Sequence, residues 1–243
     1  MTDRFVLGMP LGRWQTNCYL IGDREQGTGV IVDPGEQGEE QVPFMLEQAG
    51  VRCEAILLTH GHLDHLWSVP TLARDLDVPV LLHPDDRWIW DDPGAGLGLP
   101  SDLLAREFGF EWDPPTDRLE DVRDRQTLSF AGIRFDVRHN PGHTPGHVTY
   151  LGRDLAGVAV TFPLGEADAA SDDVLFAGDL VFAGSIGRTD FPRGSTAQMM
   201  RSLVDSVLSL EDDVLILSGH GPDTTVGRER ASNPFLLEAE RHA

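Results

Sequence analysis

The stretch THGHLDH, residues 59–65, decides how this chain is interpreted. It places His60, His62, Asp64 and His65 within six consecutive residues. A lone histidine is more often a hydrogen-bonded core residue, but this combination arises by chance in about one such chain in a thousand. Neutral imidazole nitrogens and carboxylate oxygens are ligands that suit zinc, iron and manganese. The stretch therefore predicts a metal site.

Three other loops carry residues of the same chemistry. His143 and His147 lie in the motif PGHTPGH, His220 lies in SGHGP, and Asp179 lies in AGD. Each of the four loops follows a predicted strand, at 55–58, 133–138, 214–217 and 174–176. Because strand ends along one sheet edge bring distant loops to a common rim, we expect these side chains to lie close together.

The number of ligands predicts two cations. We expect them to divide into two sets around a bridging Asp179: His60, His62 and His143 for one cation, and Asp64, His65 and His220 for the other. Two metals about 3.5–4 Å apart can share a hydroxide whose pKa falls to about 7, which makes it a nucleophile at neutral pH. Clustered ligands without cysteine favour a catalytic site, in which Asp64 would also orient the hydroxide. Zinc is the expected metal, with iron and manganese as alternatives.

Two more residues are predicted to support the ligands. Asp33 and His147 could each accept or donate a hydrogen bond at the outer nitrogen of a ligand histidine and so fix its tautomer. For Asp33 the alternative is a turn-forming role before Pro34-Gly35. The other histidines, His83 and His139 and His242, receive no predicted function.

Short β-branched runs alternate with helical patterns along the chain, which favours layered sheets with helices outside, an α/β fold. Strands are predicted at 5–9, 17–21, 29–32, 54–58, 79–82, 127–130, 133–138, 148–151, 158–162, 174–176 and 214–217, and helices at 39–49, 66–76, 196–210 and from 234. The Trp-rich stretch 84–125 breaks this pattern. We expect it to be an irregular excursion with a short helix at 101–108, which forms a lid or an oligomer contact. The acidic insertion 165–173 is expected to be a solvated loop.

Composition excludes several classes of protein. The chain has 40 acidic and 19 basic residues, a net charge of −21 and no lysine, which argues against a nucleic-acid partner, Schiff-base chemistry and a P-loop. No apolar run approaches the roughly 20 residues that span a bilayer, and no secretory signal is visible, so we expect a cytoplasmic protein without a membrane partner. Cys18 and Cys53 are expected to be buried thiols. Homo-oligomer formation stays open.

These motifs, in this order, resemble the metallo-β-lactamase superfamily over nearly the whole chain. The metal-ligand positions match one by one, and the resemblance implies a four-layer αββα sandwich formed by one domain over residues 1–243. Within the superfamily the chain is most similar to the short bacterial hydroxyacylglutathione hydrolase, or glyoxalase II, branch. Three stretches carry this narrower resemblance: PGHTPGH at 141–147, GDLVFAGSIGRTDFP at 178–192 and GHGPDTTVGRERASNPF at 219–235.

The resemblance implies hydrolysis of a small-molecule thioester such as an S-2-hydroxyacylglutathione. Arg188 matches a position where a cation meets the glutathione carboxylate, and the alternative for it is a salt bridge to Asp190. The chain ends 23 residues after His220, so the separate C-terminal helical region of longer glyoxalase II enzymes is expected to be absent.

Two alternatives to hydrolysis stay open. GRTDF also resembles the iron-dependent persulfide dioxygenase branch, although that branch usually lacks a histidine where His147 stands. The other alternative is a non-catalytic metal-binding module. β-Lactam hydrolysis is not expected, because Asp179 occupies the bridging position in glyoxalase-like surroundings.

Overall fold

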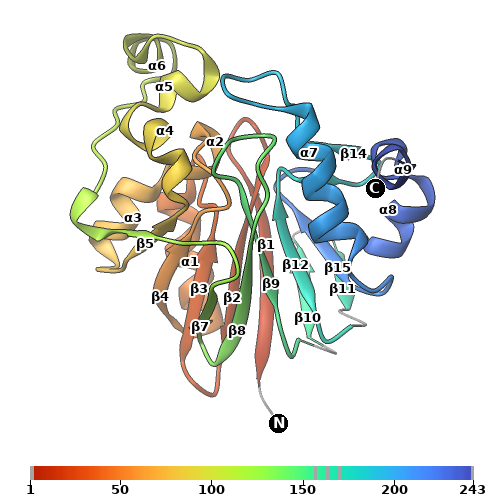
Figure 1. The fold of residues 1–243 in the computed structure, drawn as a ribbon. Helices are drawn as coiled ribbons and strands as arrows, with labels where there is room; N and C mark the ends of the chain where they lie inside the picture. Colours follow the sequence, from red (N-terminus) through yellow and green to blue (C-terminus); the bar gives the residue numbers. More distant parts are fainter. Residues whose placement is uncertain (1–2, 156–157, 163–164, 169–170, 242–243) are drawn as a thin grey trace.

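Two β-sheets packed face to face form the middle of the molecule, and helices cover their outer faces (Figure 1). The computed structural model describes residues 3–155, 158–162, 165–168 and 171–241, so His242 lies outside the described residues. The first sheet has the order β11-β10-β1-β2-β3-β4-β5-β6 and the second has the order β16-β15-β12-β9-β8-β7. A separate small hairpin pairs β13 (Val181–Phe182) with β14 (Ser185–Ile186).

The first sheet consists of β1 (Arg4–Leu11), β2 (Thr16–Asp23), β3 (Thr28–Val32), β4 (Arg52–Leu57), β5 (Val80–Leu82), β6 (Leu119–Asp121), β10 (Ala159–Phe162) and β11 (Gly165–Asp168). The second consists of β7 (Thr127–Phe130), β8 (Ile133–His139), β9 (Val148–Gly152), β12 (Val174–Gly178), β15 (Leu215–Ser218) and β16 (Thr224–Thr225). The α-helices are α1 (Gly38–Ala49), α2 (Leu63–Leu66), α3 (Val69–Asp75), α4 (Arg87–Asp91), α5 (Pro93–Leu97), α6 (Ser101–Phe108), α7 (Thr196–Leu203), α8 (Val226–Ser232) and α9 (Pro234–Arg241).

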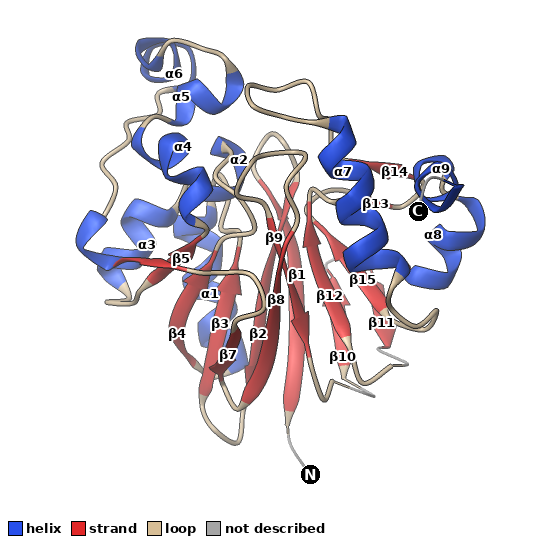
Figure 2. Cartoon of the chain, in the orientation of Figure 1, coloured by secondary structure: helices blue, strands red, loops and turns tan. Residues whose placement is uncertain are grey.

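Alternating side chains on the strands build three apolar layers. On β2, Cys18 and Leu20 pack with residues of α1 and α3, whereas Tyr19 and Ile21 point to the second sheet. On β12, Val174 and Phe176 pack between the sheets, whereas Leu175 belongs to the outer apolar layer that includes residues of α7 and α9. The order of layers is therefore helix, sheet, sheet, helix (Figure 2), which confirms the predicted αββα sandwich.

Cys18 and Cys53 are both buried free thiols, as predicted. Burial raises the pKa of Cys53 to about 11, so this thiol is protonated at neutral pH.

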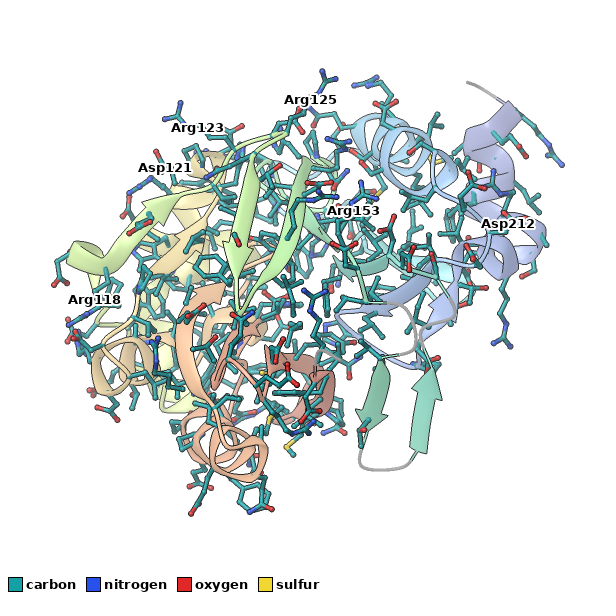
Figure 3. All side chains as sticks on the ribbon, turned by 90° about the horizontal axis from the view of Figure 1, so that it is seen from below. Arg118, Asp121, Arg123, Arg125, Arg153 and Asp212 are labelled. Carbon is teal, nitrogen blue, oxygen red and sulfur yellow. The ribbon has the colours of Figure 1, made fainter. Side chains whose placement is uncertain are left out.

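Ion pairs join the elements away from the histidine loops. Seen from below in Figure 3, Arg153 lies at the second sheet, where it pairs with Asp136 at 2.8 Å and with Asp173. Asp121 on β6 accepts from Arg87 of α4 at 2.6 Å. These pairs tie peripheral segments to the two sheets.

Several sequence predictions need correction. The acidic stretch predicted as a solvated loop contains a strand, β11, which pairs antiparallel with β10, while residues 169–170 lie outside the described residues. The stretch 84–125 is less irregular than predicted: besides the predicted helix at 101–108 it contains α4, α5 and the sheet strand β6. Polar and Pro/Gly-rich composition hid these short elements, because tertiary pairing rather than local propensity forms them.

Helix boundaries also differ from the predictions. The helix predicted at 66–76 is α3, which is separate from the short α2 that ends at Leu66. Pro70 lies in the first turn of α3, where its missing N–H is tolerated but cannot continue a hydrogen-bond ladder from α2. The helix predicted at 196–210 is α-helical only to Leu203 and continues as a π-helical turn to Leu208. Helix α8 was not predicted.

Candidate metal centre

The four histidine and aspartate loops meet at one rim, where the two sheets end. Strands β3 and β4 of the first sheet run parallel, as do β12 and β15 of the second. Strand β8 runs in the same direction as β12, since both are antiparallel to β9. The chain therefore leaves these strands at the same end of the sandwich, near α2 at the top of Figure 1.

The residues predicted as ligands form one cluster there. They fall into three overlapping groups, within each of which the ligand atoms lie within 4.8 Å of one another, and all but Asp64 and His220 are buried. We call this set the seven-residue cluster: His60, His62, Asp64, His65, His143, Asp179 and His220.

Three imidazole nitrogens converge on one side of the cluster. His62 Nδ1 lies 3.1 Å from His60 Nε2 and 2.8 Å from His143 Nε2. The outer nitrogens of two of these rings have partners of their own. His143 Nδ1 donates to the backbone oxygen of Arg188 at 2.7 Å. The hydroxyl of Thr59, 3.0 Å from His60 Nδ1, donates to Asp33 and is therefore left to accept from His60.

This arrangement points the lone pairs of His60 Nε2 and His143 Nε2 at His62 Nδ1. With the proton of each outer nitrogen engaged, His60 Nε2 and His143 Nε2 have no proton to offer inward while neutral. Burial lowers the pKa of His60 well below its ordinary value and the pKa of His62 to about 3, so both rings are neutral at pH 7. Three convergent imidazole nitrogens are a ligand set that fits a single divalent cation.

A second set of ligands lies on the other side. His220 Nε2 is 3.1 Å and His65 Nε2 is 3.5 Å from Asp64 Oδ2. The outer nitrogen of His65 donates to Asp33 Oδ2 at 2.9 Å, which turns Nε2 toward the cluster. Thr16 donates to the same oxygen of Asp64 at 3.0 Å.

Asp179 lies between the two sets. Its Oδ1 is 3.3 Å from His65 Nε2, while its Oδ2 is 3.5 Å from His143 Nε2 and 3.7 Å from His220 Nε2. Oδ1 of Asp179 thus faces the second set of ligands, and Oδ2 faces both sets. Gly219 makes this approach possible, because a Cβ there would lie 2.3 Å from Asp179 Oδ1. The position suits a carboxylate that bridges two cations.

Charge in the cluster is unbalanced without cations. Although burial alone would raise the pKa of Asp179, neighbouring His65 holds it well below the ordinary range. Burial alone would likewise lower the pKa of His65, but Asp64, Asp179 and Asp33 raise it well above its usual value. The carboxylates therefore stay ionised and attract positive charge, which a metal ion supplies as well as a proton.

The two predicted supporting residues behave differently. Asp33 contacts His65 and Thr59 and also occupies the turn after β3 with a positive φ of 50°, so both of its predicted roles are compatible with the structure. His147 does not bond to the outer nitrogen of a ligand histidine among the described residues. Its Nε2 instead accepts from the backbone N–H of Asp179 at 3.1 Å.

Arg188 forms the salt bridge to Asp190 that was the alternative to its predicted contact with a substrate carboxylate. Its guanidinium makes two bonds to Asp190, at 2.6 and 2.8 Å, and lies 4.2 Å from the ring centre of Phe191. The side chain is 60% exposed. The buried contact of this residue with the cluster is its backbone oxygen, which sequence reasoning missed because a main-chain acceptor leaves no side-chain signal.

Sequence reasoning also missed Asp86. This buried carboxylate accepts from the N–H of Gly61 at 3.0 Å, and from the hydroxyl of Thr144 and the N–H of Gly146 at 2.6 Å each. It thereby ties the loop of His60 and His62 to the loop of His143. The available signal was its place after a predicted strand, but the Trp-rich composition around it obscured that position.

A cavity of about 430 Å³ opens over the seven-residue cluster. Cluster residues and Ser185 and Arg188 supply its polar lining, and the remaining side chains are apolar: Trp14, Leu63, Leu97, Phe182, Ile186 and Phe191. A reactive group held at the metal ligands would therefore lie in a pocket with apolar walls.

Another histidine group lies apart from the cluster and consists of His83, Asp85 and His139. The two rings stack, with centres 4.0 Å apart and planes 12° apart. His139 Nε2 donates to the backbone oxygen of Pro145 at 2.7 Å, and His83 Nδ1 accepts from the N–H of Asp85. The backbone thus occupies the nitrogens that would face a cation.

Comparison with known proteins gives one consistent family. The model of the metallo-β-lactamase superfamily matches residues 11–158 and 167–220. Hydroxyacylglutathione hydrolase GloC of Haemophilus influenzae is 34% identical over 94% of this chain and 96% of its own. A crystal structure of BLEG-1, described as a B3 metallo-β-lactamase, has a TM-score of 0.78 and 32% identity, covering 96% of this chain and 99% of that chain.

A second solved structure bears on the metal. The crystal structure of TTHA1623 in a di-iron-bound form has a TM-score of 0.71 and 36% identity over 93% of this chain and 98% of that chain.

Among the residues that the structure describes here, no helix is both long and apolar enough to cross a bilayer.

Proposed function

The chain belongs to the metallo-β-lactamase superfamily, and from this membership we propose that it is a binuclear hydrolase that cleaves a small-molecule thioester, of the S-2-hydroxyacylglutathione type, to a hydroxy acid and a free thiol. The observation that carries the proposal is the convergence of the inner nitrogens and carboxylate oxygens of the seven-residue cluster at the floor of a cavity. The similarity to GloC supports the choice of thioester.

The two sets of ligands would each hold one divalent cation, with Asp179 shared between them. We propose zinc, while iron and manganese suit the same ligands and a di-iron relative is known. Two such cations, when bound, lower the pKa of a water between them and polarise a carbonyl.

The protein's own residues would orient the reactants. Asp64, fixed by the hydroxyl of Thr16, presents a carboxylate oxygen that can accept a hydrogen bond from the attacking water and hold its direction. Arg188 could meet a substrate carboxylate at the cavity by exchanging Asp190 for it. Thr59, Asp33 and the backbone of residue 188 would keep the rings of His60, His65 and His143 turned toward the cations.

The direct test combines elemental analysis with the loss of thioester absorbance on S-lactoylglutathione. We expect two metal ions per chain and hydrolysis that disappears on chelation and returns with metal. A metal-replete protein that leaves every thioester, lactone and phosphoester of a broad panel intact would overturn the proposal and support a metal-binding module.

Two other reactions need separation from this one. GRTDF at 187–191 favours an iron-dependent persulfide dioxygenase, which would bind one iron per chain and consume oxygen with glutathione persulfide. Similarity to BLEG-1 favours β-lactam hydrolysis, which a chromogenic cephalosporin would report. We expect neither oxygen consumption nor cephalosporin cleavage at rates near that of the thioester.

A further inference from the structure

We propose that the 2-hydroxyacyl group of the substrate carries an apolar chain beyond its hydroxyl-bearing carbon and that Leu97 of α5 selects for this chain, an inference that rests on the proposed thioester hydrolysis. The cavity over the seven-residue cluster has partly exposed apolar side chains on several sides: Trp14, Leu97, Phe182, Ile186 and Phe191. Apolar side chains left open around a polar floor favour a ligand with one reactive polar group and an apolar body.

The local structure of α5 holds the turn that ends in Leu97 beside the ligand His62. A Cβ placed on Gly96 would lie 2.7 Å from the side chain of Ile89 and 3.3 Å from Cδ2 of His62. Asp92 caps the helix by accepting from the N–H groups of Gly94 and Ala95. The helical turn that ends in Leu97 is therefore fixed beside His62, and through it the Trp-rich stretch 84–125 contributes to the cavity.

Aromatic rings flank both halves of the cluster. The ring centre of Phe191 lies 5.0 Å from that of His62 and 6.1 Å from that of His143. On the other side, the ring of Phe182 lies 5.9 Å from that of His220. A carbonyl held at the cluster would thus have apolar neighbours for the groups on either side of it.

Charge at the cavity distinguishes the acyl end from the thiol end. Arg188 is the one arginine that lines it among the described residues, and its 60% exposed side chain is paired with Asp190. A charged thiol such as glutathione is long enough to extend toward this exposed arginine and the solvent. The acyl chain and the thiol sulfur are both bonded to the reacting carbonyl carbon, but the acyl chain carries no charge that could pair with Arg188, so it is the end that fits against the apolar side chains.

The test uses glutathione thioesters of 2-hydroxy acids that differ only in chain length: lactoyl (2-hydroxypropanoyl), 2-hydroxybutanoyl, 2-hydroxypentanoyl and 2-hydroxyhexanoyl. With metal-replete protein we expect kcat/KM to rise about fourfold per added methylene from lactoyl onward, as expected for buried methylenes. Leu97→Ala should reduce the 2-hydroxyhexanoyl-to-lactoyl ratio about fivefold or more. Leu99→Ala, a neighbouring position outside the cavity lining, should leave the ratio unchanged. A flat series, or a preference for lactoyl over 2-hydroxyhexanoyl, would overturn the inference.

Binding of thioethers separates this inference from the reaction itself. S-hexylglutathione and S-methylglutathione cannot be hydrolysed, and we expect the hexyl compound to bind at least about tenfold more tightly by calorimetry, with the difference reduced in Leu97→Ala. If thioesters are not hydrolysed but this difference is present, the proposed reaction fails and the apolar selectivity stands. If thioesters are hydrolysed and both thioethers bind equally, the selectivity fails and the reaction stands. Thermal melting of each variant verifies its folding.

Discussion

The molecule contains two groups of histidine and aspartate side chains, and they differ in how their nitrogens are used. In the seven-residue cluster, Thr59, Asp33 and the backbone of residue 188 engage the outer nitrogens of His60, His65 and His143, so the inner nitrogens of these three rings face the cluster. In the group of His83, Asp85 and His139, the rings stack and backbone atoms occupy the nitrogens nearest Asp85.

The difference teaches that ligand chemistry alone does not make a metal site. Both groups bring imidazoles and carboxylates within a few ångströms, but only an outer partner that fixes the proton on one nitrogen directs the other at a cation. We therefore expect metal to bind at the seven-residue cluster and not beside His83.

Loss of the bridging carboxylate should have the largest effect. Asp179→Ala removes an oxygen from each set of ligands, so metal content should fall from two ions to one or fewer per chain. Hydrolysis should fall roughly a thousandfold or more, since losing even a supporting partner costs about 10–100-fold. Elemental analysis and thioester assays measure both. Asp85→Ala is the matched control and should change neither; two retained metals in Asp179→Ala would contradict the bridging role.

Loss of a residue that hydrogen-bonds the outer nitrogen of a ligand histidine should have an intermediate effect on metal binding. Asp33→Ala removes the acceptor for His65 Nδ1 and for the hydroxyl of Thr59, so metal affinity should fall about 10–100-fold. Competition with a chelator measures it. His83→Ala changes a histidine of the other group and should leave the affinity unchanged. Equal affinities in the wild type and Asp33→Ala would show that the outer bond does not orient the ring.

Asp86 should affect stability more than metal chemistry. Asp86→Ala leaves the buried N–H groups of Gly61 and Gly146 without their acceptor, which should lower the free energy of unfolding by about 2–4 kcal/mol. Urea unfolding of the metal-free protein measures the loss. The exposed neighbour provides the control, because Asp85→Ala should stay within about 0.5 kcal/mol of the wild type. Similar stabilities for the two variants would remove the proposed tie between the loops.

The smallest effect concerns the pH response of the His83 group. Burial and the adjacent His139 lower the pKa of His83 to about 4. The same histidine in the unfolded chain has a pKa of about 6.5, so between pH 4 and pH 6.5 the folded protein binds fewer protons than the unfolded chain. The free energy of unfolding is therefore highest above pH 6.5, as far as His83 is concerned, and decreases as the pH falls toward 4. Wild-type protein should therefore lose more stability over this range than His83→Gln. An NMR titration that places His83 near 6.5 would contradict this reading.

The sequence predicted the layers and the residues that gather at the rim. Strands such as β2 were recognised by local sequence patterns, and the histidine motifs directly follow predicted strands. Both are local features of the sequence, so they could be interpreted without knowing contacts between distant segments. The predicted partner of His147 was wrong, because the identity of a residue does not reveal that its nitrogen meets the backbone of Asp179.

What the sequence could not show depends on contacts between distant segments. Asp86 acts through Gly61 and Gly146, and nothing in its own neighbourhood indicates either. Strand β11 forms because β10 offers an edge for pairing, although acidic composition favours a loop. The pairing of Arg188 with Asp190 was one of two alternatives that local sequence could not separate.

Anomalous X-ray diffraction from crystals of the zinc-loaded protein tests the central claim most directly. Two peaks about 3.5–4 Å apart should lie among the inner nitrogens of His60, His62, His65, His143 and His220, on either side of Asp179. No peak should lie between His83 and His139. A single peak in the cluster, or a peak beside His83, would contradict the account.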